Sequence, residues 1–364
     1  MGATITECFL ISPPSPGDFR RAESLGLRYV AAALKDAGVS FKLQDAHAWN
    51  TSKEDVLEEI QASNASLFGV QLTFSEQIDD CEDIVDFIRQ VHPSATIVLG
   101  GHLPTFTPEY FLRNWQGLTC VSYGEAEETI VHLANYSKEP DVATLGRIPG
   151  IAFLRDTKIE RTSLPKTRNI DEISFPYRDV KDHETYGLAS VLTSRGCFYR
   201  CSFCSVPQFN VNNSGVKFRS RSAEAVADEV SDLIDNYHVT HISFIDDIFL
   251  TKSENSRRRM RELCAEFHER GMKFPFSIEC RSDGVSFETI KMLKDVGLSR
   301  VFLGLESGSD EVLSYFQKDL VVSDHRKALD VLDALQIPTA LGVILFHPNA
   351  NAENVFETLS FLES

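Results

Sequence analysis

Short apolar runs alternate with segments of helical periodicity over the first 145 residues of the chain. Strands are expected at residues 7–13, 41–45, 66–73, 96–99 and 119–123. Amphipathic helices are expected between them, at residues 25–37, 54–61 and 79–91. Because strands separated by helices pair in parallel, this pattern predicts a doubly wound α/β domain of the flavodoxin type over residues 1–145.

The expected strands of this domain end in polar or glycine-rich segments. These are residues 45–50, 73–77, 100–105 and 123–127. Ligands of doubly wound sheets bind at the carboxyl ends of the strands. Glycines such as Gly100, Gly101 and Gly124 allow a bulky ligand to approach the backbone closely. This edge of the sheet is therefore the candidate ligand site of the domain.

A different pattern follows the first domain. Residues 151–154 and 159–162 predict a β-hairpin, and charged, proline-containing segments continue to residue 186. Residues 146–186 are therefore expected to form a hairpin and a linker between two domains.

From residue 187 onward the alternation of strands and helices resumes. Strands are expected at residues 189–193, 241–245, 275–279, 300–305 and 339–345, and helices at residues 223–237, 256–270, 287–295 and 323–335. Polar residues follow each strand, as on the catalytic face of a βα barrel. The chain stops at Ser364, inside the expected fifth helix. Residues 187–364 are thus expected to form a partial (β/α) barrel that is truncated after the fifth βα unit.

Charge and composition narrow the classes of function. The 364 residues are 43% hydrophobic and 24% charged, and the formal net charge is −17. Such acidity argues against a nucleic-acid-binding protein, which normally carries a basic face. The sequence has no apolar run of membrane-spanning length and no export signal at its N-terminus. A cytoplasmic protein is therefore expected.

Three of the eight cysteines stand close together, as Cys197, Cys201 and Cys204. The other five lie singly in apolar contexts and are expected to be buried hydrophobes, namely Cys8, Cys81, Cys120, Cys264 and Cys280. Without an export signal, clustered cysteines indicate a metal or redox site rather than disulfides. Three thiolates would hold three irons of a cubane cluster and leave the fourth open to another ligand. Structural zinc is the alternative, but zinc usually takes four ligands as two pairs, and no second pair stands nearby.

The spacing Cys-x3-Cys-x-Phe-Cys, placed just after the first barrel strand, resembles that of the radical S-adenosylmethionine (radical SAM) enzymes. The doubly wound domain, the hairpin with its linker and the barrel together resemble the subgroup with an N-terminal cobalamin-binding domain. That subgroup includes methyltransferases and the anaerobic porphyrin ring cyclase. The resemblance covers most of the chain.

In the barrel, the resemblance implies that the three clustered cysteines are catalytic and hold a [4Fe–4S] cluster whose open iron is chelated by SAM. The implied contacts of SAM are Phe203, Asp246, Asp247, Arg281, Asp283, Glu306 and Ser307. By themselves, Asp246-Asp247 could instead be a turn after a strand, and Arg281 and Glu306 an ordinary ion pair. After the fifth strand, residues 346–353 lack the glycine and the Glu-Thr pair of many relatives, so His347 is either a substrate-facing group or a loop residue.

In the first domain, the resemblance implies a cobalamin site at the strand ends. The candidate residues are Asp45, His47, Thr73, Gly100, Gly101, Tyr123, Gly124 and Glu125. The cobalamin ligand pattern Asp-x-His-x-x-Gly is matched by Asp45 and His47, but Asn50 replaces its glycine. His47 could therefore be the lower cobalt ligand, cobalamin could bind without it, or the domain could be degenerate and empty.

The activity that the resemblance implies is reductive cleavage of SAM to a 5′-deoxyadenosyl radical. In a methyltransferase, one SAM methylates cobalamin, and the radical from a second SAM takes a hydrogen from an unactivated carbon that then receives the methyl group. A radical cyclisation or rearrangement without methyl transfer, and a non-catalytic iron–sulfur protein, are the alternatives. The expected partners are a small-molecule substrate, an electron donor such as flavodoxin or ferredoxin, and a partner or a missing C-terminal segment that closes the barrel.

Overall fold

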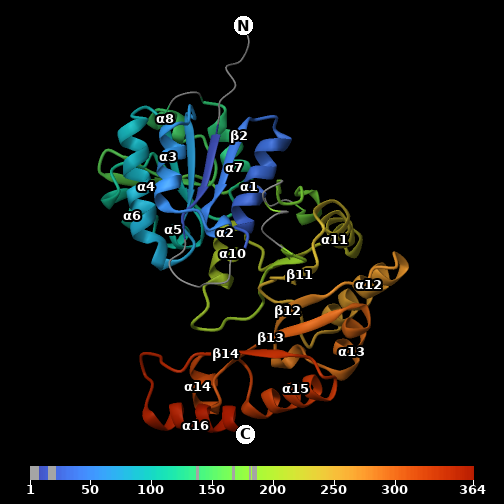
Figure 1. Ribbon diagram of the computed structural model, residues 1–364. Coiled ribbons are helices and arrows are strands. Elements are labelled where there is room, and N and C mark those ends of the chain that lie inside the picture. Colours follow the sequence, from blue (N-terminus) through green and yellow to red (C-terminus); the bar gives the residue numbers. More distant parts are fainter. Residues whose placement is uncertain (1–7, 15–21, 137–138, 166–168, 180–181, 183–186) are drawn as a thin grey trace. The chain divides into compact units, whose positions relative to one another are not determined.

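The computed structural model describes residues 8–14, 22–136, 139–165, 169–179, 182 and 187–364. The chain forms two compact units (Figure 1). The first comprises Met1–Thr185 together with Phe209–Gly215, and the second comprises Tyr186–Gln208 and Val216–Ser364. The first unit thus contains both the hairpin that was expected between the domains and a short piece of chain that follows the clustered cysteines.

The first unit is built on a seven-stranded sheet in the order β2-β1-β3-β4-β5-β6-β7. Its strands are β1 (Cys8–Ser12), β2 (Phe41–Asp45), β3 (Leu67–Gln71), β4 (Thr96–Gly100), β5 (Cys120–Ser122), β6 (Ile151–Arg155) and β7 (Lys158–Arg161). The first five are parallel in the order 2-1-3-4-5, which is the flavodoxin-like order. The hairpin β6–β7 continues the sheet because β6 pairs antiparallel with β5.

Helices cover both faces of this sheet. They are α1 (Leu25–Asp36), α2 (Ala46–Trp49), α3 (Lys53–Gln61), α4 (Ile78–Val91), α5 (His102–Phe106), α6 (Pro108–Asn114), α7 (Glu127–Ala134) and α8 (Val142–Leu145), with 3₁₀ turns η1 (Ser75–Gln77) and η2 (Ile170–Glu172). Alternate residues of β1 point to opposite faces. Cys8 and Leu10 lie in a core with α1 and α7, whereas Phe9 and Ile11 lie in a core with α3, α4 and α6. Figure 1 shows these two groups of helices on either side of the sheet. The doubly wound prediction is therefore confirmed, in a mixed sheet.

The second unit contains a five-stranded parallel sheet in the order β14-β13-β12-β11-β8. Its strands are β8 (Leu188–Val191), β11 (His241–Phe244), β12 (Phe276–Arg281), β13 (Leu298–Glu306) and β14 (Thr339–Val343). A separate antiparallel pair consists of β9 (Ser194–Gly196) and β10 (Phe218–Ser220). Along the chain, the clustered cysteines and the helix α10 (Val206–Ser214) lie between these two short strands. The sequence analysis did not predict α10.

Most helices of the second unit share a core with one face of the five-stranded sheet, and α14 is outside that core. The helices are α11 (Ala223–Tyr237), α12 (Glu254–Glu269), α13 (Phe287–Val296), α14 (Asp310–Tyr315), α15 (Val322–Ala334) and α16 (Ala352–Glu363), with the 3₁₀ turn η3 (Ser282–Gly284). Strand residues such as Ile278, Val301 and Leu303 share one core with helix residues such as Phe267 and Leu293. Five successive βα units therefore form the expected partial barrel.

Serine and asparagine side chains begin several helices of the second unit. The N-cap oxygens accept a hydrogen bond from a backbone N–H of the first turn at Ser222, Ser253, Ser286 and Asn351, with distances of 2.9–3.3 Å. Each such cap is typically worth about 1 kcal/mol, because it satisfies an N–H that has no partner inside the helix. These local signals fix where the helices start after each strand.

Gly101, at the carboxyl end of β4, occupies a position that only glycine can fill without strain. Its φ is +112°, and a Cβ there would lie 2.4 Å from the carbonyl oxygen of Leu72. The two chain segments are held together by a hydrogen bond of 2.8 Å from the Leu72 N–H to the Gly100 carbonyl. At Gly100 itself, the nearest atom to an added Cβ is the Ser122 Cβ at 3.9 Å, which is an ordinary contact. The two glycines therefore have different structural requirements.

We predict that Gly101→Ala lowers the free energy of unfolding by about 2–3 kcal/mol, because the backbone strain adds to a clash with a main-chain carbonyl. Gly100→Ala is the matched control and should cost less than about 1 kcal/mol. Urea unfolding of the two variants measures the difference. Equal stabilities would contradict the close backbone contact at Gly101.

Candidate cofactor sites

The three clustered cysteines lie in the loop between β9 and α10. All three are half-buried, and a backbone hydrogen bond of 3.1 Å from Cys204 to Cys201 closes a turn between the last two. Burial, opposed by the backbone N–H of Tyr199 and assisted by the neighbouring Cys204, Asp247 and Cys201, raises the pKa of the Cys197 thiol to about 11. Three thiols that affect one another in this way lie near each other. As a donor set, they fit an iron–sulfur cluster, in which each thiolate binds a different iron.

Arg281, at the end of β12, connects this loop to the barrel strands. Its guanidinium donates to the Asp283 carboxylate (Nε–Oδ1 3.0 Å), to the Cys201 sulfur (Nη1–Sγ 3.6 Å) and to the backbone carbonyl of Lys318. It also lies over the ring of Tyr199, 3.6 Å from the ring centroid. The Tyr199 hydroxyl in turn donates to Asp283 (2.9 Å). Arg281 and Asp283 are therefore close to the cysteine loop and fix its conformation.

Asp246 and Asp247, after β11, bind the start of the same loop. The buried Asp246 carboxylate accepts hydrogen bonds from the Thr193 N–H (3.1 Å), the Thr193 hydroxyl (2.7 Å) and the Ser194 hydroxyl. Asp247 accepts from the Gly196 N–H (2.9 Å), one residue before Cys197. Burial raises the pKa of both carboxyl groups, and Arg259, 4.0 Å from Asp246, partly offsets this for Asp246. Both residues position the loop.

Glu306 and Ser307 lie on different sides of the end of β13. Glu306, in the left-handed region at φ +69°, accepts a hydrogen bond of 2.7 Å from the largely buried Lys318 ammonium group. This ammonium lies 5.7 Å from the ring centroid of Phe203, which in turn packs edge-on against Phe316. Glu306 and Phe203 are thus brought together through Lys318. The Ser307 hydroxyl instead hydrogen-bonds to Thr358 of α16 (3.0 Å).

At the carboxyl edge of the first sheet, several of the expected cofactor contacts have partners within the protein. The Thr73 hydroxyl accepts from the side-chain amide of Gln71 (2.9 Å), and the Tyr123 hydroxyl donates to the Thr162 carbonyl of the hairpin. The Gly124 N–H donates to the hydroxyl of Thr105 (3.0 Å). Gly100 ends β4 and Gly101 follows it at the same edge, and Glu125 lies shortly after β5. This edge thus retains the glycines that a large flat ligand needs, while the hydroxyl groups of Thr73, Thr105 and Tyr123 are hydrogen-bonded within the protein.

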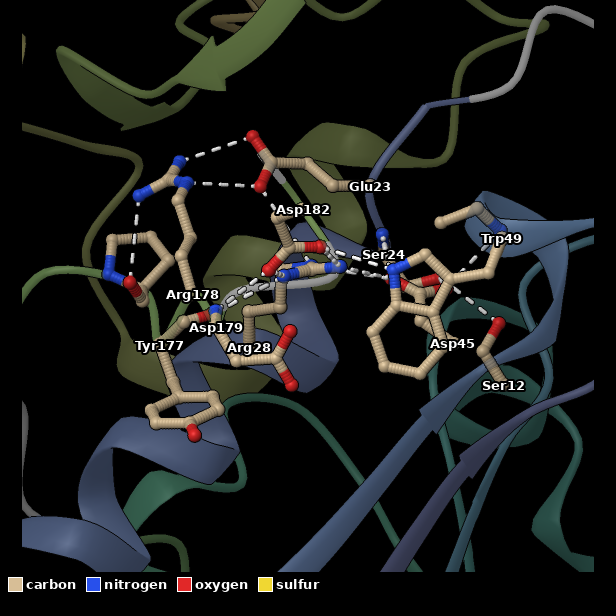
Figure 2. A network of polar contacts seen from close by, with 12 residues as sticks. Ser12, Glu23, Ser24, Arg28, Asp45, Trp49, Tyr177, Arg178, Asp179 and Asp182 are labelled. Atoms are coloured by element: carbon tan, nitrogen blue, oxygen red, sulfur yellow. Dashed lines mark hydrogen bonds and ion pairs between the residues drawn. The ribbon is translucent and has the colours of Figure 1, made fainter. Parts of the chain in front are cut away.

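Asp45, at the end of β2, does not contact His47. One oxygen accepts from the Ser24 hydroxyl (2.7 Å) and the Ala48 N–H (3.4 Å), and the other accepts from the Ser24 N–H (2.9 Å) and the Arg28 guanidinium (3.0 and 3.1 Å) (Figure 2). The Nδ1 atom of His47 is buried without a hydrogen-bond partner among the described residues. Asp45 and His47, the two residues that match the cobalamin ligand pattern, therefore share no hydrogen bond among the described residues, and Asp45 is bonded to Ser24, Ala48 and Arg28 instead.

Arg28 of α1 also binds the segment that follows the hairpin. Its guanidinium donates two hydrogen bonds to Asp182, of 2.7 and 2.8 Å, and Asp182 also accepts from the Trp49 indole N–H (3.1 Å). Close to this pair, Arg178 makes two hydrogen bonds of 3.0 Å to Glu23 (Figure 2). Buried charges join α1 and the loop after β2 to Tyr177, Arg178 and Asp182 within the first unit. Sequence analysis missed this network, because an arginine on a helix and an aspartate 154 residues away carry no local signal.

Family comparisons agree with this architecture. Residues 21–134 match the B12 binding domain family, and residues 191–362 match the radical SAM superfamily. The chain is a radical SAM enzyme with an N-terminal B12-binding domain. The expected family and the two-domain α/β fold class are therefore confirmed, whereas the expected truncation of the barrel stays a prediction. The B12-binding and radical SAM domains agree with the expected cofactors cobalamin, SAM and a [4Fe–4S] cluster.

The radical SAM enzyme resembles proteins of more than one activity. An uncharacterized methyltransferase of Pyrococcus horikoshii is 25% identical over 373 residues, which cover 98% of this chain and 78% of that protein. The anaerobic magnesium-protoporphyrin IX monomethyl ester cyclase of Cereibacter sphaeroides is 26% identical, over 91% of this chain and 54% of the cyclase. The structure of the radical SAM methyltransferase TsrM from Kitasatospora setae, with cobalamin and a [4Fe–4S] cluster bound, superposes with a TM-score of 0.83 at 19% identity, over 99% of this chain and 70% of TsrM. At that identity, the similarity to TsrM concerns the fold. The chain spans little more than half of the cyclase.

Two further observations concern the part of the chain that the structure describes. None of its helices has the length and apolar character needed to cross a membrane. No group of three His, Cys, Asp or Glu side chains converges there on a single metal ion.

Lys318 is a residue near the cysteine loop that sequence analysis missed, since it follows α14 rather than a strand end.

We predict that Asp182→Asn destabilises the protein by about 2–3 kcal/mol at pH 7, since it leaves part of the buried Arg28 charge without a partner. Burial alone would raise the pKa of Asp182, but the hydrogen bonds and charge of Arg28 lower it below its ordinary value. A lowered carboxyl pKa contributes stability above the unfolded-state value of about 4, and this contribution disappears as the pH falls through the folded-state pKa.

Urea unfolding from pH 7 to pH 3 measures the effect. The difference between wild type and Asp182→Asn should shrink in acid, and Asp156→Asn, at an exposed hairpin turn, should change little at either pH. A difference independent of pH would contradict the ion pair.

Proposed function

We propose that this radical SAM enzyme is a cobalamin-dependent methyltransferase that acts on an unactivated carbon of a small molecule. The observation that supports the proposal most directly is the succession of a B12-binding domain and a radical SAM domain, matched over 98% of the chain by a protein named as a methyltransferase. When bound, the two cofactor systems would supply one-electron cleavage of SAM and a cobalt-carried methyl group.

In this proposal, the protein's contribution at the cluster is to bind and to position. Cys197, Cys201 and Cys204 would each hold one iron and leave the fourth iron for SAM. Arg281 donates to Cys201 and stacks on Tyr199, so it sets the conformation of the loop and places a positive charge beside its thiolates. The Lys318–Glu306 pair next to Phe203 offers charged and aromatic groups to the polar parts of SAM.

At the first sheet, we propose that cobalamin binds along the carboxyl edge, near Gly100, Gly101 and Gly124, without His47 as a cobalt ligand. Asp45 is already bonded to Ser24 and Arg28 and cannot orient the imidazole. A histidine ligand normally needs such a second hydrogen bond to fix its tautomer and ring orientation.

Radical cyclisation without methyl transfer is a second candidate, supported by the match to the cyclase over 91% of the chain. The two reactions differ in their mass balance. Methylation replaces a hydrogen of the substrate by a methyl group, whereas ring closure between two positions removes two hydrogens and adds no carbon. The two reactions are distinguished by supplying the enzyme with cobalamin, cell-extract metabolites and SAM that carries a ¹³C-methyl group. Methylation places the label in the product, whereas ring closure does not.

We predict that the anaerobically reconstituted and reduced protein forms 5′-deoxyadenosine from SAM, and that Cys201→Ala lowers this rate at least about 100-fold, because it removes a ligand of the cluster. Chromatography of the nucleoside products measures the rate. Cys264→Ala, a buried cysteine on α12, is the matched control and should retain activity. Failure of the wild-type protein to form 5′-deoxyadenosine, with or without cell extract, would refute the radical SAM activity.

We predict that His47→Ala leaves the absorbance of bound cobalamin and the electron paramagnetic resonance spectrum of its Co(II) form unchanged. The wild-type spectrum should show no nitrogen splitting from a histidine ligand. Splitting that is present in wild type and lost in His47→Ala would establish His47 as the ligand and overturn this prediction.

A further inference from the structure

The polar residues of the five-stranded sheet of the second unit lie on the face opposite the core that its strands share with helices such as α12 and α13. Ile278 and Cys280 of β12 point into the core shared with the helices. Because side chains alternate along a strand, Ser277 and Glu279 point to the opposite face. In register with them, that face carries Ser243, Ser277 and Arg300 in one row and Glu279 beside Phe302 in the next. In a radical SAM barrel this is the inner face.

The first of these rows is internally hydrogen-bonded. The Ser277 hydroxyl donates to the Ser243 hydroxyl at 3.3 Å, and the His241 Nε2 atom lies 3.2 Å from the Ser277 oxygen. Burial, with a smaller contribution from Arg300, lowers the pKa of His241, which favours its neutral form. Ser243, Ser277 and His241 are thus hydrogen-bonded to one another, whereas Arg300 contributes only a positive charge near His241.

Glu279, in the next row, differs from these hydrogen-bonded residues. Its side chain is exposed and makes no hydrogen bond or ion pair with any described residue. It is nonetheless surrounded closely enough that burial, together with the charges of Asp247 and Asp246, raises the pKa of its carboxyl group. Because the side chain is exposed, this carboxylate is accessible to a ligand that carries a positive charge or hydrogen-bond donors. The protein itself provides no such partner among the described residues.

An exposed aromatic ring lies beside this carboxylate. Phe302 is paired in register with Glu279, and 42% of its surface is accessible. Its ring extends over Gly342, where an added Cβ would be 2.8 Å from the ring Cζ atom. A large apolar side chain on the inner face, fixed over a glycine of the next strand, provides a flat surface for a ligand. A carboxylate next to an aromatic face is a combination that binds cations.

Glu279 lies on the strand whose last residue, Arg281, contacts the cysteine loop. Glu279 precedes Arg281 by two residues on the same strand, so their Cα atoms are about 6–7 Å apart. Arg281 donates to the sulfur of Cys201. The carbon skeleton of a molecule whose basic group is bound at Glu279 is therefore within reach of the cysteine loop.

We propose that Glu279 and Phe302 form a substrate-recognition site for a basic group, an amine, amidine or guanidine, and so that the substrate of this enzyme carries such a group. The inference rests on the proposed radical SAM function and specifies its substrate class. Glu279 binds the cation by charge-assisted hydrogen bonds, and Phe302 contacts its flat or apolar neighbourhood.

Benzamidine and its neutral analogue benzamide are the probes of this site, because they have the same shape and differ in charge. Their dissociation constants are measured anaerobically by calorimetry, in the cluster-containing protein without reductant, so that no turnover is needed. We expect Glu279→Gln to weaken the binding of benzamidine about tenfold and to change that of benzamide less than about twofold. Phe302→Leu should weaken benzamidine binding about threefold.

Glu262→Gln, an exposed residue of α12, is the matched control for the change in net charge and should leave both affinities unchanged. Thermal unfolding shows that Glu279→Gln is folded, and this variant should be at least as stable as wild type at pH 8, since it removes an unpaired carboxylate. The proposal is overturned if benzamidine does not bind, if Glu279→Gln leaves its affinity unchanged, or if Glu262→Gln weakens it equally. If the wild-type enzyme forms 5′-deoxyadenosine but fails the benzamidine test, only the recognition site is refuted. If it passes the benzamidine test but forms no 5′-deoxyadenosine, the radical function is refuted.

Discussion

The cysteine loop of this protein depends on charged side chains from neighbouring strand ends. Between β9 and α10 the loop has no regular secondary structure that could fix three thiols in space. Asp246 and Asp247 bind its first residues through backbone and hydroxyl hydrogen bonds, and Arg281 binds Cys201 and Tyr199 further along. A parallel sheet makes this possible, because the carboxyl ends of its strands meet at one edge.

These contacts change the interpretation of residues that a family resemblance marks as cofactor contacts. Asp246 and Asp247 use several acceptor sites on the loop itself, and Ser307 uses its hydroxyl on α16. In the first unit, Asp45 belongs to the Arg28 network rather than to His47. A polar residue at a strand end can thus serve the ligand site indirectly, by holding the segment that carries the ligand groups.

Much of the fold could be predicted from the sequence, because the strand and helix periodicities and the caps are local. The strands of both sheets lie close to their expected positions, and Cys197, Cys201 and Cys204, predicted from their spacing and their place after the first barrel strand, lie together in one loop. Other features depend on contacts between distant residues. The hairpin joins the first sheet by pairing with β5, and α10 begins two residues after Cys204. Lys318, which follows α14, donates a hydrogen bond to Glu306. None of these leaves a periodic signal in the sequence.

The inner face of the second sheet illustrates the same limit and what the structure adds to it. In the sequence, Glu279 is one acidic residue at the end of a predicted strand and has no motif of its own. The register places it beside Phe302 and one layer from Arg281, and the hydrogen bonds show that the neighbouring serines are satisfied while Glu279 is not. Groups that are bonded to one another contribute little to binding, because they already have partners. The unpaired carboxylate is the group that can distinguish one substrate from another, since a site built around an unsatisfied charge rejects molecules that leave it unpaired.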